Sequence, residues 1–242
     1  VKIENNKGSK IQNNLSIIDL FSFDVVDKNL RNNFEKLFNQ YEVNIEKYTK
    51  SLLNKLQQKD NNIKEELLYL FTSKLTNSFR NPYCIKKTLN TIGAGAHFYP
   101  SDDGNAETYK MVINGKKPQQ EYICRYLGIT HEEYSLWLRS LFMMLMRPKN
   151  GDALNMLEEM IQDLFTNRDY CKQIHVHQYT NKYVLLSDRS YAMDDSKEKS
   201  TIFYFNLCYK AFVVYGFIDL HNISLPSGYS SRTINHYKDE NN

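Results

Sequence analysis

The sequence predicts an α+β protein in which helices fill the N-terminal two-thirds and a small antiparallel β-sheet follows. Apolar residues recur at three- and four-residue steps as far as about residue 167, which is the spacing of amphipathic helices. Beyond about residue 170 apolar and polar residues alternate, which is the spacing of strands. The 9 Gly and 5 Pro together make 14 of 242 residues, a low share that favours long helices over an all-β fold with many turns.

The sequence also indicates a domain organisation. A chain of 242 residues can bury a core of its own, so one domain is expected. We divide the chain into an extended arm at 1–26, an α+β domain at 27–223 and a polar tail at 224–242 that is a candidate for disorder. Within the domain, helices are expected over 27–167 and the sheet over 172–217. The arm carries apolar side chains that can dock on another surface, namely Ile17, Ile18, Leu20, Phe21 and Phe23.

The strongest helical pattern predicts a pair of long helices. An apolar stripe over 27–56 indicates a first helix of about 30 residues. Asn62 and Glu65 have the spacing of a capping box that begins the second helix, and Pro82 ends it. Asn81 and Pro82 then suit the first positions of a third, short helix.

The later elements are predicted from the same kinds of signal. Thr130 and Glu133 form a capping box that begins a helix over about 131–146, and Asp152 is expected to cap the helix after it. Four strands are predicted, around 174–177 and at 183–186, 201–209 and 211–217.

Composition and charge exclude several classes of protein. A net charge of +3 does not by itself indicate a nucleic-acid partner, although residues 1–100 are mildly basic. The four cysteines include no Cys-x-x-Cys pair, which excludes a zinc ribbon and indicates a reduced, cytoplasmic protein. The longest apolar run, 141–146, is far below the roughly 20 residues of a membrane span, so no span is expected. The sequence leaves any cofactor or metal undetermined.

His175 and His177 have the most informative spacing in the chain. Residues two apart on a strand point to the same face, so the two imidazoles would lie together. Such a pair can carry out acid–base chemistry or contribute to a metal site, but a metal needs a third ligand and no sequence signature supplies one. The alternative is a solvated strand face, with Ile174 and Val176 pointing inward.

Four further residues, in two segments of the chain, complete the predicted site. Ser187, Asp188 and Arg189 end the predicted second strand, where either a site or a simple turn is common. Arg80 ends a helix, where its charge can stabilise the helix dipole or its guanidinium can bind a phosphate. We expect these side chains and the two histidines to lie close together where the sheet meets the helices. The catalytic residues would be His175, His177 and Asp188, and the substrate-binding residues would be Arg80, Ser187 and Arg189.

The order of these features resembles a family of bacterial proteins of unknown function. Members of that family open with a His-Tyr-Val-Pro motif and later carry an Arg-x-Pro step at a helix end and a Ser-Asp step after a strand. The matching positions are Arg80, Pro82, Ser187 and Asp188, the resemblance extends loosely over 30–215, and the opening motif is absent. Because the family has no established activity, the resemblance implies a site region and no reaction.

These observations predict a bacterial protein of the defence or toxin type that hydrolyses nucleic-acid phosphodiesters. Histidine would act as general acid and base, and Arg80 would neutralise phosphate charge. The alternative is a non-enzymatic interaction module whose long helices bind a partner chain or a second copy, with the apolar arm as its motivation. Sequence-specific DNA binding through the helix–turn–helix-like spacing at 123–130 ranks last, because Glu132 and Glu133 would repel phosphates.

Overall fold

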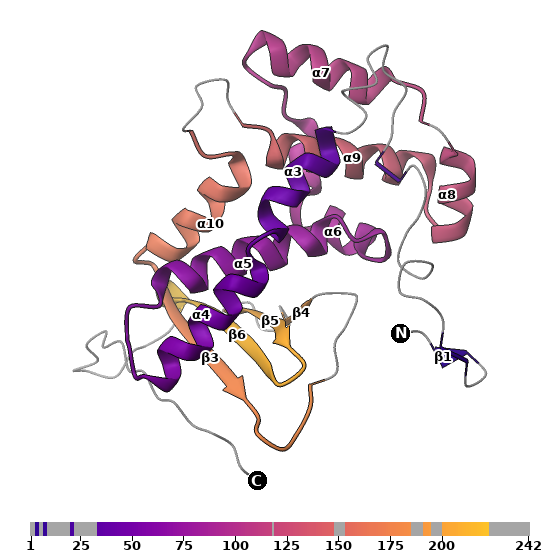
Figure 1. The fold of residues 1–242 in the computed structure, drawn as a ribbon. Helices are drawn as coiled ribbons and strands as arrows, with labels where there is room; N and C mark the ends of the chain where they lie inside the picture. The colour runs from indigo at the N-terminus through magenta and orange to yellow at the C-terminus, as the bar shows by residue number, and fades with distance from the viewer. Residues whose placement is uncertain are drawn as a thin grey trace.

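The computed structural model describes residues 3–4, 7–8, 20–21, 33–117, 119–147, 153–184, 191–194 and 200–222. Within these residues, helices are followed by a four-stranded antiparallel sheet, so the predicted α+β class is confirmed (Figure 1). The α-helices are α3 (Asn33–Glu42), α4 (Ile45–Gln57), α5 (Lys64–Phe79), α6 (Ile85–Ile92), α7 (Asp103–Asn114), α8 (Gln120–Leu127), α9 (His131–Leu145) and α10 (Met156–Thr166).

The strands of the sheet are β3 (Tyr170–Gln178), β4 (Tyr191–Asp194), β5 (Ser200–Cys208) and β6 (Ala211–Asp219). Short 3-10 helices are η1 (Pro82–Cys84), η2 (Gly93–His97) and η3 (Leu220–Asn222), and β1 (Ile3–Glu4) pairs with β2 (Lys7–Gly8). Among the described residues, no helix is both long enough and apolar enough to cross a membrane.

The first predicted helix is divided in two. α3 ends at Glu42 and α4 begins at Ile45, with Val43 and Asn44 in a turn between them. A β-branched residue followed by Asn is a poor helix former, because Val loses rotamer freedom in a helix and Asn competes with the backbone for hydrogen bonds. The apolar stripe therefore identifies the buried face, but the prediction of a single 30-residue helix is wrong.

The capping predictions have mixed outcomes. Thr130 and Glu133 form the expected capping box at α9, and Asn81 accepts a hydrogen bond from the Tyr83 backbone at the start of η1. The predicted cap at Asn62 is wrong, because α5 begins after Ile63 and has no side-chain cap.

The helix after residue 150 begins later than predicted. Asp152 lies outside the described residues, and the N-cap of α10 is Asn155. The Asn155 side chain accepts a hydrogen bond from the Glu158 backbone, and the Glu158 carboxylate accepts one from the Asn155 backbone. This reciprocal capping box places Glu158 in the first turn, where a negative charge stabilises the helix dipole.

The strand order in the sheet is β3-β6-β5-β4, and every neighbouring pair is antiparallel. The predicted second strand at 183–186 is wrong for its described part, since residues 183 and 184 lie outside the ladder. Val184 instead donates one backbone hydrogen bond to Tyr209, in the β5–β6 turn (2.7 Å). The edge strand β4 lies further along the chain and pairs with β5.

One face of the sheet is covered by helices and packs into the core. The buried residues that alternate along β5 and β6 are Phe203, Phe205, Leu207, Ala211, Val213, Tyr215 and Phe217. Phe71 of α5 lies at their centre, with ring-centroid distances of 4.9 Å to Tyr215 and 5.1 Å to Phe203. The Tyr215 hydroxyl donates to the Leu67 carbonyl at 2.9 Å, which anchors α5 to β6. We call this side the inner face and the opposite side the outer face.

α9 forms the centre of the helical layer. The Trp137 indole donates to the Phe79 carbonyl (2.7 Å), and the Tyr134 hydroxyl donates to the Leu20 carbonyl (2.6 Å). Phe21 packs against Phe38 and Trp137, with centroid distances of 4.9 and 5.3 Å. Leu20 and Phe21 of the predicted arm thus dock on the domain, whereas Ile17, Ile18, Phe23 and the tail at 224–242 lie outside the described residues.

The Phe71 ring cluster leads to a stability prediction. Phe71→Ala leaves a cavity between α5 and the sheet, so we expect the free energy of unfolding to fall by about 3–5 kcal/mol. The matched control is Phe98→Ala, because Phe98 is exposed, and its effect is expected within about 0.5 kcal/mol. Urea unfolding followed by circular dichroism measures both, and equal effects would contradict the central role of Phe71.

Candidate functional site

The structure places His175 and His177 together on the outer face of the sheet. Both belong to β3, and their ring centroids are 6.4 Å apart. His175 is exposed. His177 is half-buried and stacks on Phe212 of β6, with 4.5 Å between ring centroids and an interplanar angle of 8°. The two imidazoles therefore lie on the same face of the sheet, as predicted.

The outward position of the histidines follows from their neighbours in β3. Ile174 is opposite Tyr215 and Val176 is opposite Val213, both on the inner face. These apolar partners pack on the core, and strand residues alternate between faces, so His175 and His177 must point away from the helices. The alternation predicted from the sequence is confirmed.

The residues around the histidines on the outer face are aromatic, aliphatic or polar and uncharged. On β6, the residues opposite His175 and His177 are Val214 and Phe212. On β5, the residues opposite these two are Tyr204 and Asn206. In β3, β5 and β6, all of which the structure describes, the outward positions hold no Asp or Glu. The sequence did not identify Phe212 or Tyr204 as neighbours, because only the pairing register brings them beside the histidines.

Arg80 lies away from the two histidines. Its guanidinium pairs with Glu42 of α3 at 3.0 Å and lies 5.2 Å from the Phe38 ring centroid. These contacts are on the helical side of the sheet, whereas the histidines are on its outer face. The structure therefore does not bring Arg80 to the histidines, and the expected convergence of the two is not observed.

The other three predicted site residues are those at the end of the predicted second strand. Ser187, Asp188 and Arg189 lie outside the described residues. Their roles as catalytic or substrate-binding groups stay predictions. The described part of the candidate site is the histidine pair with the outer-face residues beside it.

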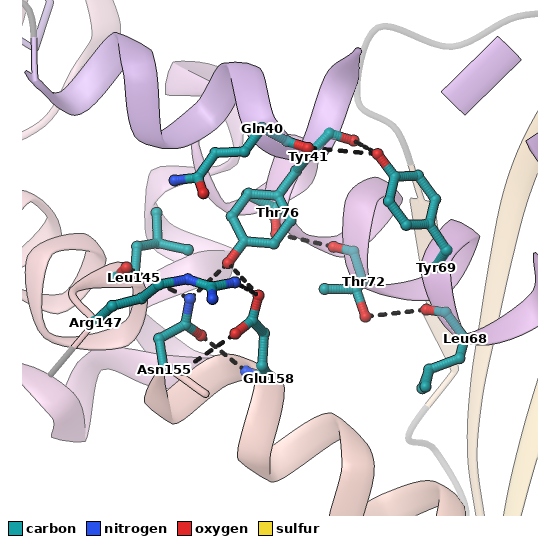
Figure 2. Close-up of polar contacts among 10 residues, drawn as sticks. All are labelled: Gln40, Tyr41, Leu68, Tyr69, Thr72, Thr76, Leu145, Arg147, Asn155 and Glu158. Carbon is teal, nitrogen blue, oxygen red and sulfur yellow. Dashed lines mark hydrogen bonds and ion pairs between the residues drawn. The ribbon is translucent and has the colours of Figure 1, made fainter. Parts of the chain in front are cut away.

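A second polar cluster lies between α3, α10 and the chain after α9 (Figure 2). The Tyr41 hydroxyl donates to the Glu158 carboxylate (2.9 Å) and accepts from the Asn155 side chain (2.5 Å). Arg147 donates to the same Glu158 oxygen (2.6 Å). The Tyr69 hydroxyl donates to the Tyr41 carbonyl at 3.1 Å, which links α5 to the cluster. Sequence periodicity did not reveal this cluster, because its members are 114 and 117 positions apart along the chain.

The chemistry of this cluster indicates a structural role, and we call Tyr41, Asn155, Glu158 and Arg147 the latch. Burial raises the pKa of Tyr41 to about 12, and the neighbouring Glu158 carboxylate acts in the same direction. A phenol held in its neutral form is a hydrogen-bond donor and a poor base or nucleophile. We therefore assign the cluster to the positioning of α3 against α10 rather than to catalysis.

Among the described residues, no three His, Cys, Asp or Glu side chains are grouped closely enough to hold a metal ion. All four cysteines are free thiols, namely Cys84, Cys124, Cys171 and Cys208.

A cavity of about 290 Å³ opens between α5, α6, α10 and the sheet. Its walls are mostly apolar core side chains such as Phe71 and Leu157, with Asp163 as the charged member of the lining. Thr91 and Tyr170 also line the cavity, but the Thr91 hydroxyl donates to the Lys87 carbonyl and the lining includes no His, Lys or Arg. These groups do not define a reaction. The outer face is therefore the better candidate site.

Comparison of the chain with protein-family models, with curated proteins and with solved structures found no match.

The latch around Tyr41 leads to a second prediction. Tyr41→Phe removes the hydroxyl that joins Asn155 to Glu158 and leaves their polar atoms buried, which we expect to cost about 1–3 kcal/mol of stability at pH 7. Tyr99→Phe is the matched control, since the Tyr99 side chain is exposed. Urea unfolding checks the difference, and an equally stable Tyr41→Phe protein would contradict the latch.

The pKa of Tyr41 predicts how this stabilisation depends on pH. A pKa raised to about 12 in the folded chain, above the ordinary value of about 10, means that folding favours the neutral phenol. The contribution is fully present below about pH 10 and is lost as the pH rises through about 12. The stability difference between the wild type and Tyr41→Phe should therefore shrink over this interval. Unfolding curves at several pH values test this, and a constant difference would contradict it.

Proposed function

We propose that the chain cleaves nucleic-acid phosphodiesters on the outer face of its sheet, with His175 and His177 as the general acid and base. The observation that carries the proposal is the presence of two imidazoles on one face, 6.4 Å apart between ring centroids. Two imidazoles this close on one face can contact the same phosphoryl group, one through each ring, when it lies over both.

The two histidines have complementary roles in this reaction. One neutral imidazole accepts the proton of the attacking hydroxyl group while the hydroxyl oxygen forms a bond to phosphorus. The other, protonated imidazole donates a proton to the leaving oxygen while the P–O bond breaks. Histidine suits both roles because it changes charge near neutral pH. Arg80 has no part in the proposal, since its guanidinium pairs with Glu42 on the other side of the sheet.

The biological setting is part of the same proposal. We place the protein in the cytoplasm, which is supported by four cysteines that are all free thiols. A bacterial origin is supported by the resemblance at Arg80 and Pro82, and a defence or toxin role would follow from the cleavage of nucleic acid.

The alternative, a module that binds a partner chain through its long helices, has less support. Leu20 and Phe21 of the apolar arm pack against the chain's own helices, and Leu52 of α4 is fully buried. Sequence-specific DNA binding has less support still. α9 would be the recognition helix, but it buries Tyr134 and Trp137 in the core and cannot enter a major groove.

A cleavage assay tests the proposed function. His175→Ala and His177→Ala should each lower the rate of cleavage of RNA or DNA by about 10²-fold or more, because each removes a proton-transfer group. His221→Ala is the matched control, since His221 is exposed and pairs with Asp169 at the end of the sheet. Rates measured with and without a divalent metal give the metal dependence directly.

The pH profile adds an independent readout. An acid and a base acting together give a bell-shaped dependence of kcat/KM on pH, and each single variant should lose one arm of the bell. Absence of cleavage by the wild type, or undiminished cleavage by both variants, would refute the proposal.

A further inference from the structure

The ring stack on the outer face continues beyond the histidines. Phe212 stacks with His177 on one side and lies 6.2 Å from Tyr179 on the other, at an interplanar angle of 28°. Tyr179 follows β3, and its backbone N–H donates to the Lys210 carbonyl at 2.9 Å. The stack therefore runs from the histidines to the turn between β5 and β6.

Two exposed tyrosines and a lysine lie at that turn. Tyr183 and Tyr209 stack with 5.9 Å between centroids, and their side chains are 73% and 56% exposed. The Lys210 amine lies 5.7 Å from the Tyr183 ring centroid and 5.8 Å from that of Tyr209. A backbone hydrogen bond from Val184 to Tyr209 holds the two segments together. We call His177, Phe212, Tyr179, Tyr183 and Tyr209 the aromatic tract.

The charges along the aromatic tract favour a polyanion. Lys182 is exposed beside Tyr183, and Lys210 lies over both tyrosine rings. The outward positions of β3, β5 and β6, all described, hold no carboxylate that would repel phosphates. Aromatic rings with flanking cations are the combination by which proteins bind unpaired bases and their backbone.

We propose that the aromatic tract binds single-stranded RNA and delivers it to the histidine pair. The proposal rests on the proposed function, which it deepens by naming the substrate class. Bases must be unpaired because a duplex hides their faces from aromatic side chains. RNA rather than DNA is the substrate because its 2′-hydroxyl supplies the attacking oxygen.

The reaction balances with these groups alone. The 2′-oxygen forms a bond to phosphorus, its proton passes to one imidazole, and the bond from phosphorus to the 5′-oxygen breaks. The 5′-oxygen takes a proton from the other imidazole. The products are a 2′,3′-cyclic phosphate and a 5′-hydroxyl end, and an identical strand with a 2′-deoxy sugar at the cleavage position stays intact.

A binding experiment tests the aromatic tract separately from cleavage. His175→Ala is the background, so that the RNA stays intact, and the probe is a fluorescent ten-nucleotide single-stranded RNA followed by anisotropy. Adding Tyr183→Ala or Tyr209→Ala should weaken binding about tenfold, the usual effect of removing one stacking ring. Adding Lys210→Gln should weaken the salt dependence of binding, so that the slope of the log association constant against log salt concentration becomes less negative by about 0.7.

The chain contains a matched control for the tyrosines. Tyr122 and Tyr126 of α8 also stack, at 6.0 Å, and are 58% and 56% exposed, but Glu121 is their neighbour. Tyr122→Ala should leave RNA binding unchanged. Circular dichroism melts of all variants verify that each one is folded, and Tyr183 and Tyr209 provide two independent tests.

The outcomes separate the two proposals. RNA binding without cleavage by the wild type supports the aromatic tract and refutes the proposed function. Wild-type binding in both tyrosine variants, or an equal loss in Tyr122→Ala, overturns the aromatic tract even if cleavage occurs. Equal binding and cleavage of single-stranded DNA overturns the assignment to RNA, and equal binding of duplex RNA overturns the stacking of unpaired bases.

Discussion

The contact between Phe71 and the inner face of the sheet determines the arrangement of the whole outer face. Phe71 is fully buried, and its ring meets aromatic rings from β5, β6 and α10. The hydrogen bond from Tyr215 to Leu67 anchors the same helix to the same strand. Because strand side chains alternate, burying one set against α5 leaves the other set outside. His175 and His177 face outward for this reason, and a slip of one residue in β3 would bury both imidazoles.

The helical layer holds α5 in place through buried polar groups that find partners far away in the chain. The Trp137 indole bonds to the end of α5, and Tyr41 joins α3 to the first turn of α10. A buried hydroxyl or indole N–H that lost its partner would cost free energy, so these contacts restrict the helices to one arrangement. Glu158 has three roles: it caps α10, accepts a hydrogen bond from the Tyr41 hydroxyl and pairs with Arg147.

The candidate site differs from the latch in the freedom of its side chains. Tyr41 is buried with its donors and acceptors in contact, whereas His175, Tyr183 and Tyr209 are exposed. The antiparallel sheet holds the backbone of His175, and the backbone hydrogen bond from Val184 to Tyr209 ties the segment of Tyr183 to the β5–β6 turn. A backbone held in this way, with accessible side chains, suits a binding surface. The tract shares His177 with the histidine pair and extends from there to the β5–β6 turn, so a single strand bound along it would contact both.

Much of the fold could be predicted from local patterns, because periodicity and capping act over a few residues. The α+β class, the outward alternation of His175 and His177 and the box at Thr130 and Glu133 needed only such patterns. The same patterns failed where short-range signals compete. Val43 and Asn44 interrupt the helix although the apolar stripe continues on both sides of them. Asn155, rather than the expected Asp152, is the N-cap of α10.

The sequence by itself therefore determined the fold class and the placement of two imidazoles on one strand face, since both follow from spacing along the chain. Only the tertiary structure decided which groups surround them. The pairing register brings Phe212 to His177, the β5–β6 turn brings Lys210 to Tyr183, and helix packing ties Arg80 to Glu42. These contacts join residues that are distant in sequence, and they form because the buried side chains permit one register and one helix arrangement.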